Sequence, residues 1–338
     1  MAGSGKYRHL AAPQRSGSGL IKSMAGAILQ PKAQLPLSGV YGLMVLAAAA
    51  WGGTFVAGRL VALECPPLTA AFWRFTLAAL VVVPLLKKRE GRLLPAGLPF
   101  SGWVLLALLG ATGMLGYNYF FIKGLSMTEA GRASVIVAVN PGLTYLGTVL
   151  FFGEKFTGRG LAGFVSALIG VALAITHGRP WTLFSGQIGL GEILIFGCVI
   201  CWSAYSLLGK VVLERLTPLM STAWACLFGL FFLAPGALME SGPMAFLNFS
   251  PTAWICLAFL GLAGTALGFT IYYQGIVRLG AGRAAIFINL VPVFGIFCGW
   301  LFLGEKLDWS LAAGLALILI GIRLIQTPGI TGFRQKAA

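Results

Sequence analysis

Residues 124–174 read GLSMTEAGRASVIVAVNPGLTYLGTVLFFGEKFTGRGLAGFVSALIGVALA, and residues 275–322 read GIVRLGAGRAAIFINLVPVFGIFCGWLFLGEKLDWSLAAGLALILIGI. Both segments contain Gly-Arg-Ala, a proline inside an apolar run, Gly-Glu-Lys and two glycines seven residues apart, at a constant offset of 151 residues. The same offset pairs three tryptophans with three others: Trp51 with Trp202, Trp73 with Trp224, and Trp103 with Trp254. Because tryptophan is rare, three such pairs in one ungapped register indicate an internal repeat.

The composition places this repeat in a membrane. The chain of 338 residues is 58% hydrophobic and 10% charged, with a mean hydropathy of +0.89. Soluble domains average about 25% charged residues, because their surface faces water. The charge here is too sparse to cover such a surface, which excludes soluble enzymes and soluble nucleic-acid-binding proteins despite the net charge of +15.

Ten apolar stretches have the length of about 20 residues that a membrane-crossing helix needs. They are residues 38–58, 67–86, 101–122, 130–152, 158–176, 189–209, 219–238, 252–275, 281–303 and 308–326. The sequence therefore predicts an all-α membrane protein with ten transmembrane helices in a lipid bilayer. Each copy of the repeat holds five spans, and an odd number makes the second copy enter from the opposite face. This is the inverted-repeat arrangement of secondary transporters.

The basic residues predict the orientation. Of the 24 Lys and Arg residues, 18 lie on the side of the two termini. Five lie on the other side, namely Arg59, Lys123, Arg132, Arg179 and Lys306. The positive-inside rule then places both termini in the cytoplasm, and the basic pI needs no nucleic-acid partner. The expected organisation is a basic cytoplasmic tail at 1–37, repeats at 38–180 and 187–326, and a cytoplasmic tail at 327–338.

The sequence predicts no enzyme, no metal site and no cofactor. Both histidines, His9 and His177, lie outside the spans, and no nucleophile–base pair or phosphate-binding loop is present. Cys198 and Cys201 form a Cys-x-x-Cys without a second such motif or a paired histidine, so helix packing is the preferred interpretation.

The segment WGGTFVAGRL at residues 51–60 and the repeated stretches at residues 124–174 and 275–322 resemble the EamA family of the drug/metabolite transporter superfamily. The shared features are a helix start rich in small residues, a proline within a helix, a terminal Gly-Glu and a glycine-spaced last helix. The resemblance covers about residues 38–326. It implies a ten-helix transporter of small metabolites, commonly an exporter of amino acids or related compounds.

Prolines inside two spans mark candidate pathway positions. Pro141 and Pro292 are repeat-equivalent, and each removes a backbone hydrogen bond and is expected to kink its helix. A freed carbonyl in the membrane must face protein, a polar side chain or a water-filled cavity. The two kinks therefore either flank the pathway or serve packing alone. Asn140 and Asn289 beside them either bind the solute or cap the freed carbonyls.

Aromatic and amide side chains within the spans are the other candidates for lining the pathway. They offer a ring face together with hydrogen bonds, which suits an amphipathic solute. Nearer to the span ends, the same residue types would be interfacial anchors. The candidates are Trp51, Tyr117, Asn118, Trp202, Tyr205, Tyr272 and Gln274.

Arg74 lies inside the second span, where a charge is costly and marks a functional hypothesis by default. It either binds a substrate carboxylate or hydrogen-bonds helix-end carbonyls as a structural clamp. Its repeat counterpart is Ala225, so the repeat does not demand an arginine.

All nine acidic residues lie at or near span ends. A proton-coupled exporter of cations usually needs a buried carboxylate, so their placement argues against that mechanism. Glu154 and Glu305 close one helix before the next and are expected to be anchors. Glu192, near the start of the sixth span, is the best remaining proton carrier.

The sequence as a whole predicts an inner-membrane exporter of small amphipathic metabolites, with amino acids, including aromatic ones, as the preferred class. Its mechanism would be alternating access around a central cavity, with or without a proton gradient. The alternative is a proton-coupled multidrug or cation exporter. The expected partners are a small-molecule substrate and the bilayer, for a monomer or a homodimer.

Overall fold

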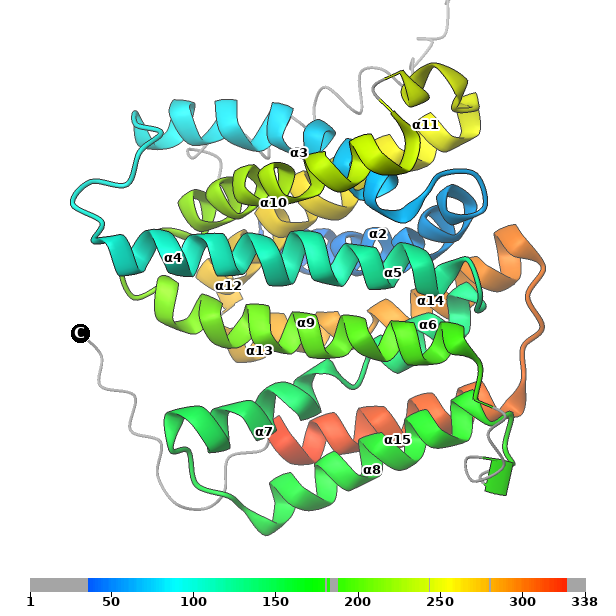
Figure 1. The fold of residues 1–338 in the computed structure, drawn as a ribbon. Coiled ribbons are helices and arrows are strands. Elements are labelled where there is room, and N and C mark those ends of the chain that lie inside the picture. The colour runs from blue at the N-terminus through cyan, green and yellow to red at the C-terminus, as the bar shows by residue number, and fades with distance from the viewer. Residues whose placement is uncertain (1–35, 180, 183–187, 243, 280, 327–338) are drawn as a thin grey trace, which may run out of the picture. The chain divides into compact units, whose positions relative to one another are not determined.

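The computed structural model describes residues 36–179, 181–182, 188–242, 244–279 and 281–326, and the regular elements in these ranges are all helices (Figure 1). Ten helical spans are long and apolar enough to cross a membrane. This confirms the predicted all-α fold. Residues 1–35 and 327–338, most of the two predicted tails, lie outside the described part of the chain.

The spans follow the same order in both halves. The first half holds α2 (Leu37–Ala62), α3 (Pro67–Glu90), the continuous run α4 (Phe100–Leu109), η1 (Gly110–Gly116) and α5 (Tyr117–Leu125), the pair α6 (Ala130–Val137) and α7 (Asn140–Phe152), and α8 (Gly158–Ile175). The second half holds α9 (Leu190–Val212), α10 (Pro218–Ser241), the run α11 (Pro251–Ala258), η4 (Phe259–Leu267) and α12 (Gly268–Leu279), the pair α13 (Ala281–Ile288) and α14 (Val291–Leu303), and α15 (Trp309–Gln326). A short helical turn, η3 (Ala245–Asn248), lies in the loop after α10.

Equivalent helices of the two halves run antiparallel. At the start of α3, the Thr69 amide donates to Glu240 Oε2 near the end of α10 at 2.9 Å. At the end of α3, Thr217 Oγ1 just before α10 donates to Glu90 Oε1 at 2.5 Å. Glu90 and Glu240 therefore lie at opposite ends of the bundle, as two oppositely threaded five-span repeats require.

The two halves also meet at α8 and α15, which lie side by side (Figure 1). A Cβ atom on Gly170 would lie 2.5 Å from the carbonyl oxygen of Gly314, and a Cβ on Gly163 equally close to that of Gly321. The reciprocal contacts hold for Gly314 and Gly321. The glycines spaced seven residues apart thus let two backbones touch within one chain, as small residues do in membrane helices.

The fourth and ninth spans are broken where the sequence predicts continuous kinked helices. Residues 138–139 and 289–290 form turns between the helices of each pair. Val139 and Leu290 donate their amides three residues back, to Ile136 and Phe287, which tightens the end of α6 and of α13. Pro141 and Pro292 then stand in the first turn of α7 and α14, where a missing amide hydrogen costs nothing. A new helix start is therefore the better description than a kink.

The third and eighth spans each contain a π-helical segment, η1 and η4, which the apolar pattern of the sequence does not predict. The offset of 151 residues maps η1 onto residues 261–267 of η4, so the two segments are repeat-equivalent. Side chains bond to carbonyls five residues back in these wide turns: Asn118 Nδ2 to Gly113 at 3.0 Å, and Thr265 Oγ1 to Leu260 at 3.2 Å. Such segments are frequent at functional sites. Their glycines were the one feature of the sequence that could have indicated an irregular helix here.

Candidate functional site

An aromatic cluster lies between the two halves. The repeat-equivalent Trp51 of α2 and Trp202 of α9 both contact the ring of Phe269, with centroids 5.7 and 6.3 Å apart. The aromatic cluster consists of Trp51, Tyr117, Trp202, Tyr205, Phe269 and Tyr272, joined by ring contacts of 5.3–6.3 Å. Five of its members were predicted candidates from four different spans. Phe269 was not predicted, because a phenylalanine does not stand out from the other residues of an apolar span.

Trp51 also makes a polar contact with the π-helical segment η4. Its indole Nε1 donates to the Gly264 carbonyl oxygen at 2.8 Å, and a Cβ on Gly268 would approach the same nitrogen to 2.6 Å. The indole hydrogen, which is costly to leave unpaired in a membrane, is thereby satisfied.

Replacing Trp51 by phenylalanine is expected to destabilise the protein by about 1–2 kcal/mol, because a buried carbonyl of Gly264 loses its donor while the ring contacts remain. Thermal unfolding of the purified protein in detergent checks this. Trp300→Phe, at an indole that is 48% exposed, is the matched control. Equal melting temperatures for both variants would contradict the prediction.

Arg74 joins the two π-helical spans. Its Nη1 donates to Asn118 Oδ1 at 2.7 Å, and its Nη2 donates to Thr265 Oγ1 at 3.5 Å. The side chain is 9% exposed, and its Nε has no hydrogen-bond partner in the described part of the chain. These contacts are to side chains, rather than to the helix-end carbonyls that one of the two sequence interpretations expected. Thr265 was missed, since a single threonine in an apolar span gives no signal.

The Arg74 cluster (Arg74, Asn118 and Thr265) adjoins the aromatic cluster at Gly264. A Cβ on Gly264 would lie 3.8 Å from Arg74 Nη2 and 2.8 Å from the Thr54 methyl group, while the Gly264 carbonyl holds the Trp51 indole. A buried cation and an aromatic surface therefore meet at one place.

Four of the other predicted residues lie at or near the helix breaks. Asn140 and Pro141 begin α7, and Asn140 Oδ1 is buried without a partner among the described residues. Asn289 lies in the second break, and the Pro292 carbonyl accepts a hydrogen bond from Ser134 Oγ at 3.3 Å. Gln274 follows Tyr272 in α12.

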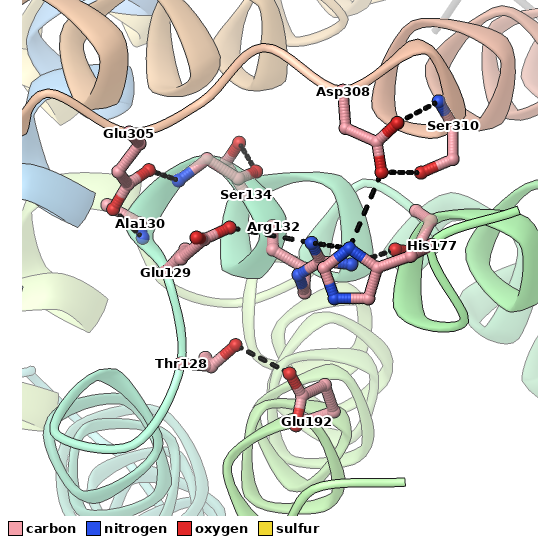
Figure 2. A network of polar contacts seen from close by, with 12 residues as sticks. Thr128, Glu129, Ala130, Arg132, Ser134, His177, Glu192, Glu305, Asp308 and Ser310 are labelled. Atoms are coloured by element: carbon pink, nitrogen blue, oxygen red, sulfur yellow. Dashed lines mark hydrogen bonds and ion pairs between the residues drawn. The ribbon is translucent and has the colours of Figure 1, made fainter. Parts of the chain in front are cut away.

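Glu305 connects the second half of the chain to the first. Its carboxylate accepts hydrogen bonds from the amides of Ala130 and Gly131, at 2.7 and 2.8 Å, at the start of α6 (Figure 2). Arg59 Nε lies 3.9 Å from the same carboxylate, and the Arg59 guanidinium also donates to the Thr128 carbonyl. A carboxylate at a helix N-terminus satisfies free amides and complements the helix dipole. Glu305 thus fastens α6 to the loop before α15.

A polar network extends from this contact (Figure 2). Thr128 Oγ1 donates to Glu192 Oε1 at 2.8 Å, so the sixth span is tied to the same end of the bundle. Arg132 lies 2.9 Å from His177 Nδ1, which lies 3.4 Å from Asp308 Oδ2. Burial opposes ionisation of Asp308, but hydrogen bonds with Ser310 and His177 outweigh it and lower the pKa of the Asp308 carboxyl below its usual value.

The opposite end carries the repeat-equivalent pair. The offset of 151 residues maps Arg59 onto Lys210 and Glu154 onto Glu305, and Lys210 Nζ lies 2.8 Å from Glu154 Oε1. The hydrogen bond from Lys210 lowers the pKa of the Glu154 carboxyl below its usual value. The side chains of Arg59 and Glu305 are 27% and 11% exposed, whereas those of Lys210 and Glu154 are 46% and 39% exposed.

The side chain of Glu305 is closely packed against a glycine of α14. A Cβ on Gly299 of α14 would lie 3.3 Å from the Gly131 amide and would collide with the Glu305 carboxylate. A Cβ on Gly295 would collide with the Ser134 side chain. The repeat-equivalent residues of Gly295 and Gly299 are Thr144 and Thr148, so the sequence does not repeat this close approach in α7.

Comparisons with known proteins agree with this architecture. The EamA-like transporter family matches residues 38–176 and 189–327. An uncharacterized transporter of Bacillus subtilis (strain 168), YyaM, is 30% identical over 271 residues, covering 80% of this chain and 88% of the relative. A probable terminal-alkyne amino-acid exporter of Streptantibioticus cattleyicolor is 28% identical, covering 69% of this chain and 76% of the relative. One crystal structure superposes with a TM-score of 0.56 at 20% identity over 85% of this chain and 97% of the other, which shows similarity of fold.

Proposed function

Because this chain belongs to the EamA-like transporter family and is thus a multi-pass membrane transporter rather than an enzyme, we propose that it exports small amphipathic metabolites. Amino acids, including aromatic ones, are the preferred class. One observation carries the proposal: Trp51 and Trp202, equivalent in the two repeats, meet at Phe269 beside a polar cluster. The amino-acid exporter among the relatives supports the same class.

Alternating access is the mechanism of this proposal. The contacts of Glu305 with α6 close one end of the bundle, and the equivalent Lys210–Glu154 pair lies exposed at the other end. In the opposite state, the Glu305 contacts would open and Glu154 would take the buried position, because inverted repeats can exchange conformations. The protein would lie in the inner membrane, with both termini and the Lys210–Glu154 end facing the cytoplasm.

The alternative, a proton-coupled multidrug or cation exporter, fits the charge distribution less well. The buried charge next to the aromatic cluster is the guanidinium of Arg74, which repels a cationic solute. Glu192, the remaining candidate proton carrier, accepts a hydrogen bond from Thr128 in the network at the Glu305 end.

Flux measurements in proteoliposomes test the proposal. We expect a radiolabelled aromatic amino acid to move down its concentration gradient without a pH gradient, and Glu192→Gln to retain that flux. Glu214→Gln, at an exposed loop residue, is the control for reconstitution. Flux that requires the pH gradient and disappears in Glu192→Gln alone would refute the uncoupled mechanism.

A further inference from the structure

Arg74 is a buried cation without a counter-ion among the described residues. The ion pairs found there are Arg59–Glu305, Arg132–Glu129 and Lys210–Glu154, and Asp308 lies 3.4 Å from His177 Nδ1. The partners of its two terminal nitrogens are a neutral amide and a neutral hydroxyl. Its third nitrogen, Nε, has no partner in the part of the chain that the structure describes. A charged group in this position is expensive unless an anion compensates it.

The repeat shows which side chains occupy the equivalent positions in the other half. The equivalents of Arg74, Asn118 and Thr265 in the other half are Ala225, Phe269 and Met114. Ala225 and Met114 are buried in one apolar cluster, where α10 packs on η1 as α3 packs on η4. The inverted copy therefore has apolar side chains at these three positions. A guanidinium is not required to hold such a segment in place.

The surroundings of Arg74 suit a small solute with an anionic group. The cluster adjoins Gly264, and the carbonyl oxygen of Gly264 accepts a hydrogen bond from the indole of Trp51 in the aromatic cluster. A guanidinium binds a carboxylate through two parallel charge-assisted hydrogen bonds, which is its strongest common interaction. A ligand that pairs with Arg74 would thus place its apolar part against the rings.

We propose that Arg74 binds the carboxylate of the exported solute, and that the substrates of this transporter are small carboxylates. The inference rests on the proposed function for the statement that the bound molecule is a transported one. It assigns recognition of the acidic group to Arg74, with Asn118 and Thr265 as positioning residues that hold the guanidinium. Cationic drugs and amides would be rejected, because they leave the buried charge unpaired.

Thermal-shift titrations of the purified wild type test the ligand class without any substitution. The probes are matched pairs of acid and amide: phenylalanine and phenylalaninamide, leucine and leucinamide, and 3-phenylpropionate and its amide. We expect each acid to bind about 10- to 100-fold more tightly than its amide, the range of a charge-assisted hydrogen bond. Equal binding of acid and amide, or binding of cationic compounds alone, would overturn the inference.

Asn118→Asp places a carboxylate at the atom that already accepts from Arg74 Nη1, with almost no change in shape, at the cost of the hydrogen bond from Asn118 Nδ2 to the Gly113 carbonyl. We expect this internal anion to replace the ligand, so that the preference for acids over amides disappears while the protein still folds. Arg74→Gln should lose the same preference, Arg74→Lys should keep part of it, and Glu214→Gln should keep all of it. If Arg74 were a structural residue only, Asn118→Asp would leave the preference unchanged, and that result would overturn the inference.

The flux assay separates this inference from the proposed function. Binding of acids through Arg74 without export of any amino acid would refute the proposed substrate and leave the carboxylate site standing. Export of amino acids with equal binding of acid and amide would refute the carboxylate site and leave the proposed substrate standing.

Discussion

Glu305→Ala is expected to open the Glu305 end of the protein. The change removes the acceptor for the amides of Ala130 and Gly131 and the partner of Arg59. Leaving buried donors unpaired costs about 1–3 kcal/mol for each group. A loss of about 3 kcal/mol in the closed state shifts the equilibrium between the two conformations by roughly 150-fold. The variant should therefore populate the opposite state and export its solute much more slowly.

Hydrogen exchange measured by mass spectrometry checks this at the amides themselves. The peptide that covers residues 128–136 should exchange at least about tenfold faster in Glu305→Ala, since the α6 amides lose their acceptor. Glu305→Gln, which keeps one acceptor oxygen, should lie between this variant and the wild type. Glu154→Ala is the matched control, because its side chain is 39% exposed at the other end. The same exchange rate in all four proteins would refute the assignment of Glu305 as a closing contact.

Gly170→Leu is expected to prevent stable folding. A Cβ at this position would lie 2.5 Å from the Gly314 carbonyl oxygen and 3.1 Å from the Ile318 amide nitrogen, and backbone atoms cannot rotate away. α8 and α15 would have to separate, which removes an interface between the two halves. Overpacking a close contact usually lowers the stability of a protein by about 1–3 kcal/mol. We expect a loss at or above the upper limit here, because the contact is between two backbones.

The yield of monodisperse protein and its melting temperature measure this effect. Gly158→Leu is the matched control, since nothing lies within 4 Å of a Cβ at that exposed glycine in the first turn of the same helix. We expect Gly158→Leu to behave as the wild type and Gly170→Leu to aggregate or to melt at least several degrees lower. Similar melting temperatures for both variants would show that α8 and α15 do not depend on this contact.

Much of the candidate site could be predicted from residue types within the spans. Trp51, Tyr117, Trp202, Tyr205 and Tyr272 were recognised because large amphipathic side chains are unusual within apolar helices, and ring contacts join them in the structure. Phe269 and Thr265 were not recognised. A phenylalanine or a threonine in an apolar span looks the same whether it faces lipid or another helix, so its role depends on neighbours far away in the sequence.

The ten spans, the repeat, the inversion of its second copy and the family resemblance were determined by the sequence alone. These properties follow from local composition, a fixed offset of 151 residues and an odd number of spans, none of which needs a tertiary contact. The tertiary structure alone decided how the two identical Gly-Glu-Lys motifs differ. Glu305 is buried on the amides of α6, whereas Glu154 pairs with Lys210 in an exposed position. The difference arises because the partners of each carboxylate come from the other half of the chain, and only folding determines which of the two carboxylates is buried.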